Sequence, residues 1–170
     1  SPYAEKVSSY LVEVYMNTRS YDAALKSIDR IAKPSAQILE AKQKILFQLG
    51  TQSFANADFE QALKYLNQSI AIGQYNRQTK ADAYYWCGES YYRLNRMVEA
   101  ARDFNAYLQL TTQPNNEMYA LANYNLGYIA FHRKDYTQAS NYFQKYVQLE
   151  KGENATALAD AYNRIGDCHL

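Results

Sequence analysis

Four of the six glycines in this chain recur at a nearly constant spacing: Gly50, Gly88, Gly127 and Gly166 are 38 or 39 residues apart. An alanine follows each of the first three by twelve residues. A glycine inside a helix costs roughly 1 kcal/mol relative to alanine. Its regular recurrence therefore indicates a compensating gain, the close approach of a second helix. The sequence predicts an array of one repeated two-helix unit.

Other positions of the unit repeat in the same register. A large apolar residue stands sixteen positions after each of the first three glycines, at Leu66, Phe104 and Phe143. Within each half of the unit, apolar residues recur at the spacing of one helix face. The N-terminal segment follows the pattern with Val12 in place of the glycine. We therefore expect four full units, at approximately residues 3–34, 38–73, 80–113 and 117–151, and a half unit at 155–170.

One stretch of the chain, residues 83–92, carries the repeat pattern most clearly. It reads Ala-Tyr-Tyr-Trp-Cys-Gly-Glu-Ser-Tyr-Tyr and is followed by Ala100 and Phe104. This order of residues resembles the tetratricopeptide repeat, although the period is longer than 34 residues and the terminal proline of the pattern is absent. The resemblance implies an all-α fold, a right-handed superhelical solenoid of four helix-turn-helix units and one extra helix.

Charge and composition argue against several functional classes. The formal net charge is +1, from 18 basic and 17 acidic residues, so a nucleic-acid footprint is not expected. No apolar run approaches the ~20 residues that span a bilayer. Neither the two histidines nor the two cysteines have a metal-ligand spacing. We therefore expect no metal and no cofactor, and we interpret the chain as non-catalytic.

Aromatic residues are frequent, with 18 Tyr, 6 Phe and 1 Trp. Many of them stand three before, one after or four after one of the glycines Gly50, Gly88 and Gly127, although Thr51 and Glu89 hold two of these positions. In the tetratricopeptide family these positions line the concave surface where peptides or partner helices bind; the alternative is that they only buttress neighbouring helices. The residues predicted to bind a partner are Phe47, Thr51, Phe54, Tyr85, Glu89, Tyr92, Tyr124, Asn125, Tyr128, Phe131 and Arg164. We expect Phe54, Tyr128 and Phe131 to be the most exposed.

The best-known subclass of the family binds a C-terminal carboxylate with a clamp rich in lysine and asparagine. Asn125 and Arg164 match two positions of that clamp, but Tyr85, Glu89 and Asp160 occupy the other three. A carboxylate clamp is therefore not expected. We instead expect a protein–protein interaction scaffold that binds an extended peptide or helix in an aromatic-lined concave groove.

A second interpretation is a surface that contacts carbohydrate or peptidoglycan, since exposed Tyr and Trp also stack on sugars. Residues 83–92 further resemble the long repeats of periplasmic proteins linked to the Tol-Pal system and envelope assembly in Gram-negative bacteria. That resemblance implies a periplasmic or cell-envelope location. Because the sequence stops within a repeat, we expect it to be an excerpt of a longer protein. We also expect this excerpt to self-associate end to end through its last helix.

Overall fold

Helices make up the fold of this computed structural model, which describes residues 2–17, 19–150, 152 and 154–170, with side chains at residue 8 and from residue 11 onward. The helices are α1 (Pro2–Asn17), α2 (Tyr21–Asp29), α3 (Ala36–Ala55), α4 (Phe59–Ala71), α5 (Arg77–Arg93), α6 (Met97–Leu110), α7 (Glu117–His132), α8 (Tyr136–Leu149) and α9 (Ala155–Cys168), with a 3₁₀ helix η1 at Gly73–Tyr75. These described residues contain no strand, and the all-α prediction is confirmed.

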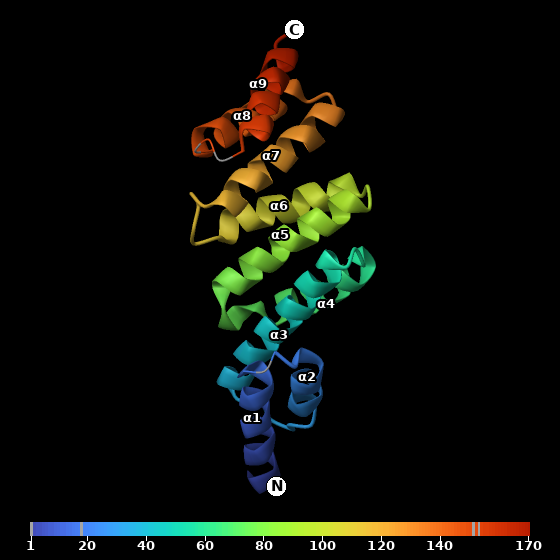
Figure 1. The fold of residues 1–170 in the computed structure, drawn as a ribbon, viewed down its shortest axis with the longest axis vertical. Coiled ribbons are helices and arrows are strands. Elements are labelled where there is room, and N and C mark those ends of the chain that lie inside the picture. Colours follow the sequence, from blue (N-terminus) through green and yellow to red (C-terminus); the bar gives the residue numbers. More distant parts are fainter. Residues whose placement is uncertain (1, 18, 151, 153) are drawn as a thin grey trace.

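The helices pair in chain order and the pairs stack into an elongated solenoid (Figure 1). We call α1, α3, α5, α7 and α9 the first helices, and α2, α4, α6 and α8 the second helices. The two termini lie at opposite ends of the stack (Figure 1). The third pair begins at Arg77, three residues before the expected start, because the Asn76 side chain caps α5 by accepting a hydrogen bond from the Thr79 backbone N–H at 2.9 Å.

The turns that begin α4 and α8 share one design. Asp58 and Asp135 cap α4 and α8, since their carboxylates accept from the backbone N–H three residues later at 3.2 Å. The residue before each cap has a positive φ, 61° at Ala57 and 64° at Lys134. The backbone N–H of Asp58 donates to the Ser53 carbonyl at 2.9 Å, which closes the preceding helix in a Schellman motif.

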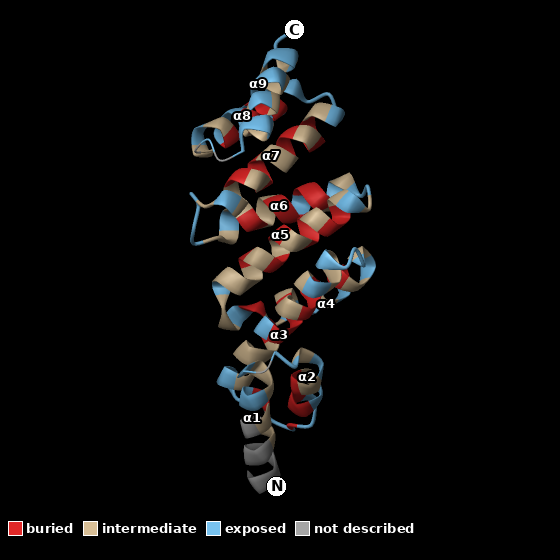
Figure 2. Ribbon diagram, in the orientation of Figure 1, coloured by how far each residue is buried: buried red, intermediate tan, exposed pale blue. Residues whose placement is uncertain are grey.

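Gly50, Gly88 and Gly127 lie where the second helix of the same unit packs tightly against the first. A Cβ atom at Gly127 would lie 2.7 Å from the ring of Phe143, and one at Gly88 would lie 2.8 Å from the ring of Phe104. The side chains nearest these two glycines are thus the large residues sixteen positions on. Those large side chains belong to the core, which runs along the whole solenoid (Figure 2).

Candidate functional site

The predicted binding residues lie on α3, α5, α7 and α9, where contacts between successive first helices form one surface. The rings of Phe54 on α3 and Trp86 on α5 meet with centroids 4.9 Å apart. Asn125 on α7 donates to the carboxylate of Glu89 on α5 at 2.6 Å. We call this surface the first-helix face, because each of these contacts joins one first helix to the next.

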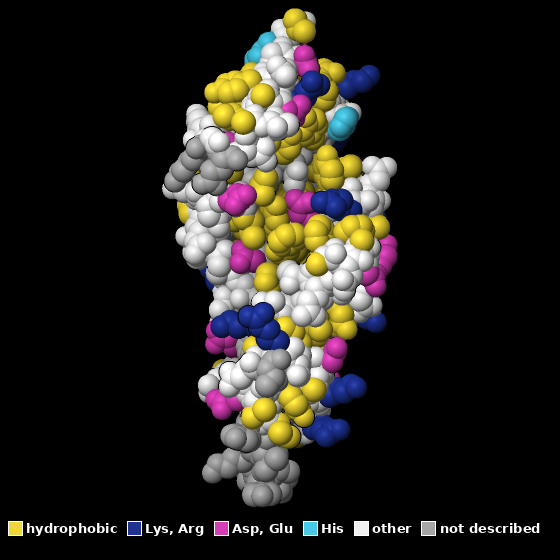
Figure 3. Space-filling model, in the orientation of Figure 1, with side chains coloured by type: hydrophobic (Ala, Val, Ile, Leu, Met, Phe, Trp, Pro, Cys, Tyr) yellow, Lys and Arg dark blue, Asp and Glu magenta, His cyan; other side chains and the backbone are white. Residues whose placement is uncertain are grey.

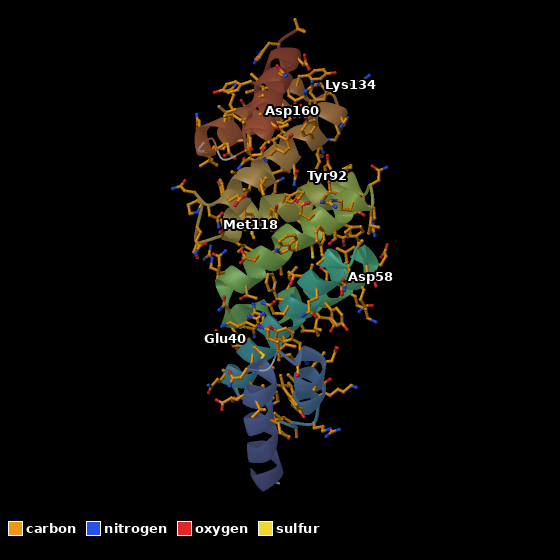
Figure 4. The ribbon with its side chains drawn as sticks, viewed as in Figure 1. Glu40, Asp58, Tyr92, Met118, Lys134 and Asp160 are labelled. Carbon is orange, nitrogen blue, oxygen red and sulfur yellow. The ribbon has the colours of Figure 1, made fainter. Side chains whose placement is uncertain are left out.

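The contacts between α7 and α9 continue this face. The hydroxyl of Tyr124 donates to the carboxylate of Asp160 on α9 at 2.8 Å, and the hydroxyl of Tyr128 donates to the same oxygen. In Figure 4, Tyr92 of α5 and Asp160 of α9 lie along the same side of the solenoid. Polar bonds therefore join the first helices of the last two repeats.

A cavity of about 320 Å³ opens on the first-helix face between α5 and α7. Its lining consists of Tyr85, Trp86, Asn116, Glu117, Met118 and Leu121. Figure 3 shows hydrophobic side chains in a hollowed band over these two helices, with acidic and basic side chains at its margins. A larger cavity, of about 560 Å³, lies between α1 and α3 and contains none of the predicted residues.

Tyr85 presents almost no surface to a partner, since it is only 3% exposed. Its ring packs against Phe104 and Tyr107 with centroids 5.7 and 5.5 Å away, and its hydroxyl donates to Glu89 at 3.0 Å. At this position the structure therefore matches the buttressing alternative. The other ten predicted residues are half-buried: Phe47, Thr51, Phe54, Glu89, Tyr92, Tyr124, Asn125, Tyr128, Phe131 and Arg164.

Phe54, Tyr128 and Phe131, which we expected to be the most exposed, are half-buried like seven other predicted residues. Phe54 packs against Phe59 as well as Trp86, and Tyr128 packs against the ring of Phe143 at 5.1 Å. Phe131 packs against Tyr136, and the guanidinium of Arg164 lies over its ring. These large side chains are covered because each contacts its own second helix or the next first helix.

The charge of Arg164 is already matched by carboxylates. Its guanidinium lies 3.7 Å from Asp160 and 2.9 Å from Asp167, both on α9. These two ion pairs leave little net positive charge to attract a carboxylate of a partner.

Three tyrosines of this face are held in the neutral form. Burial raises the pKa of Tyr128 far above its ordinary value, and the hydrogen bond to Asp160 raises it further. The pKa of Tyr124 is raised by the same two causes. Burial, and then the charge of Glu89, raises the pKa of Tyr85. All three hydroxyls therefore remain hydrogen-bond donors at neutral pH.

These shifts predict a loss of stability at alkaline pH. A tyrosine whose folded pKa exceeds its unfolded value of about 10 stabilises the fold fully below that pH, and this contribution is lost as the pH rises above it. We expect Tyr85→Phe to flatten the fall in the free energy of unfolding between about pH 9 and 11. Urea unfolding at several pH values measures it. A variant and wild-type protein with parallel pH profiles would contradict this assignment.

Sequence reasoning missed several residues of the cavity: Trp86, Glu117, Met118 and Leu121. Trp86 stands two positions before Gly88 and Leu121 stands six before Gly127, so the glycine register could have located both. Asp160 stands six positions before Gly166, but we interpreted it from the sequence only as a residue that does not match the carboxylate clamp. Within the described residues, no group of three or more His, Cys, Asp or Glu side chains is arranged to hold a metal ion.

Comparisons with known proteins agree with this geometry. Two family models, both described as tetratricopeptide repeat, match residues 47–117 and 120–152. The chain belongs to the tetratricopeptide-repeat family. Tetratricopeptide repeats indicate a protein–protein interaction scaffold. In the described part of this tetratricopeptide-repeat chain, no helix has both the length and the apolar character needed to cross a membrane.

Solved structures share the fold at low sequence identity. The crystal structure of MamA protein matches with a TM-score of 0.63 at 17% identity, covering 99% of this chain and 82% of MamA. BtubC (BKLC) from P. vanneervenii matches with a TM-score of 0.65 at 13% identity, covering 95% and 70%. YrrB, described as a TPR protein with an unusual peptide-binding site, matches with a TM-score of 0.62 at 16% identity, covering 93% and 72%. A comparison with curated protein sequences finds no match.

Proposed function

We propose that this tetratricopeptide-repeat chain is a non-catalytic scaffold that binds an extended segment of a partner protein along the first-helix face. The observation that carries the proposal is the cavity between α5 and α7, where Trp86, Met118 and Leu121 provide apolar surface. Tryptophan, tyrosine and methionine are enriched in protein interfaces. A cavity of about 320 Å³ is large enough for one bulky apolar side chain of the partner.

The charges around the cavity indicate which partner residue should stand beside the apolar side chain that enters it. Glu117 is exposed and lines the cavity, and the half-buried Glu89 lies on the same helix as Trp86. Glu89 already accepts hydrogen bonds from Tyr85 and Asn125, which hold its carboxylate in place on this face. We therefore expect a partner segment with a large apolar residue beside a lysine or arginine, because complementary charge favours encounter and register.

A peptide library selected on the purified chain tests this proposal. Leu121→Glu places a charge in the cavity and should weaken the selected peptides by about 2 kcal/mol, roughly 30-fold. The matched control is Val98→Glu, because Val98 lies on the second helix α6 and is 74% exposed. We expect the control to bind within about twofold of wild type, as a surface substitution outside the site. Circular dichroism establishes that both variants keep their helices.

A charge-neutral variant separates the cavity from its acidic margin. Glu117→Gln should lower the affinity of the lysine- or arginine-containing peptides and reduce its dependence on salt, while leaving the apolar anchor in place. If Val98→Glu abolishes binding while Leu121→Glu leaves it unchanged, the partner uses the outer helices and the proposal is wrong. Binding of glycans, with no peptide selected at all, would favour the carbohydrate-contacting alternative instead.

A further inference from the structure

The carboxylate of Glu89 is held in place on the first-helix face, but no positive charge matches it. Its Oε1 atom accepts hydrogen bonds from the Tyr85 hydroxyl at 3.0 Å and from the Asn125 side-chain amide at 2.6 Å. Its other oxygen, Oε2, accepts no hydrogen bond from the described part of the chain and remains open to solvent. The ion pairs among the described residues involve other carboxylates. Glu89 therefore offers a free acceptor oxygen with an unmatched negative charge.

The charges around Glu89 favour a cation at this oxygen. Arg93 stands one turn further along α5, but its guanidinium lies over the ring of Phe54, 5.4 Å from the ring centroid. Burial raises the pKa of Tyr85 most, and the charges of Glu89 and then Glu117 raise it in the same direction. Two carboxylates thus act on one aromatic ring, and their combined field attracts a positively charged group of a partner.

The cavity and Glu89 lie one helical turn apart. Tyr85 lines the cavity and stands four residues before Glu89 on α5, and Leu121 lines it and stands four residues before Asn125 on α7. Because a helix rises 1.5 Å per residue, the apolar and polar layers are separated by about 6 Å along both helices. In an extended chain, side chains on one side recur every second residue, about 6.6–6.8 Å apart. An extended segment parallel to α5 and α7 can therefore occupy both layers with residues two positions apart.

We propose that Glu89 is a subsite for a lysine or arginine that stands two positions from the apolar side chain in the cavity. Because this subsite rests on the proposed function, it applies to a partner segment whose apolar side chain occupies the cavity. The ammonium or guanidinium group donates to Oε2 of Glu89, and a hydrogen bond between two charged groups is stronger than a neutral one. Glu89 thereby determines the register of the partner as well as its charge.

The layer beside the cavity also distinguishes an extended partner from a helical one. A helix that binds in a groove uses apolar side chains at i, i+3 or i+4, and i+7, so it needs a continuous apolar stripe. Here the layer next to the cavity consists of Glu89 and Asn125, whose side chains are polar and bonded to each other. The partner segment is therefore an extended chain that carries one large apolar residue and one basic residue, separated by a single position.

A positional scan with labelled synthetic peptides tests this subsite on the purified chain. Each peptide carries the apolar residue found in the selected peptides and a single arginine, placed one, two, three or four positions before or after it. The remaining positions are alanine or serine. We expect arginine two positions away, on one side of the apolar residue, to bind about fivefold or more tightly than arginine at the other spacings. Fluorescence polarisation measures the affinities.

The variant Glu89→Gln removes the charge but keeps an oxygen that can accept from Tyr85 and Asn125. It should weaken the best arginine peptide by about tenfold or more, as expected for the loss of a hydrogen bond between charged groups. The analogue of that peptide with glutamine in place of arginine should bind wild type and variant within about twofold of each other. The matched control is Glu60→Gln, an exposed carboxylate on the second helix α4, which should weaken neither peptide.

Three results would overturn the assignment: equal affinity for every arginine position, a best position three or four residues from the apolar residue, or an arginine peptide that binds Glu89→Gln as well as wild type. The variant Leu121→Glu separates this outcome from the proposed function. If it weakens every peptide while the arginine position has no effect, the cavity binds the partner but Glu89 does not. If it leaves every peptide unchanged, the proposed function is wrong and the subsite fails with it.

Discussion

Replacing Phe104 with alanine should lower the free energy of unfolding by about 3–5 kcal/mol, the range for a buried phenylalanine. Its side chain is 0% exposed and fills the space at Gly88. Its ring also supports Tyr85, which lies beneath the first-helix face. The cavity left behind cannot collapse easily, because rigid helices border it on both sides. Urea unfolding followed by circular dichroism measures the loss.

The matched control for this truncation lies on the same helix. Val98 of α6 is 74% exposed, so Val98→Ala should change the free energy of unfolding by no more than about 0.5 kcal/mol. If Phe104→Ala costs less than about 1 kcal/mol, the side chain is not a central element of the core. In that case the repeat-by-repeat packing inferred from the glycine register would be wrong.

Gly127→Leu should destabilise the fold by about 2 kcal/mol or more, through overpacking. Even the Cβ atom would lie 2.7 Å from the ring of Phe143, and the remaining leucine atoms need further space. Removing a helical glycine offsets only about 1 kcal/mol of this cost. The cost of overpacking therefore exceeds the gain in helix propensity, and we expect Gly127→Leu to lower the free energy of unfolding.

The same substitution at Gly166 should change the free energy of unfolding in the opposite direction. Nothing lies within 4 Å of a Cβ atom there, so Gly166→Leu should raise the free energy of unfolding by up to about 1 kcal/mol, the helix-propensity gain. Thermal or urea unfolding of the two variants side by side makes the comparison. If both substitutions change the free energy of unfolding in the same direction, the glycines do not recur because a second helix packs against them.

Much of the fold could be predicted because one register repeats through the chain. The glycines located the helix crossings, and Asp58 and Asp135 located the starts of α4 and α8. The positive-φ residue before each second helix could not be predicted, because Arg19, Ala57, Asn95 and Lys134 share no common residue type. There the turn imposes the conformation on whichever residue occupies the position.

The site was less predictable, because burial depends on the neighbouring repeat. Tyr85 and Tyr124 hold the same position relative to their glycines, yet Tyr85 is buried and Tyr124 is half-buried. The difference follows from tertiary neighbours: Phe104 and Tyr107 enclose Tyr85, whereas Tyr124 reaches across to Asp160 on α9. Sequence offsets thus located the first-helix face but not the exposed fraction of each side chain.

The emission of Trp86 provides the most direct measurement of the proposed binding surface. It is the only tryptophan in the sequence and lines the cavity between α5 and α7. A selected partner peptide without tryptophan should change the intensity or wavelength of this emission, and the change should saturate at one peptide per chain. If calorimetry shows the peptide binding with the same stoichiometry while the emission of Trp86 stays constant, binding occurs away from the cavity and the account is contradicted.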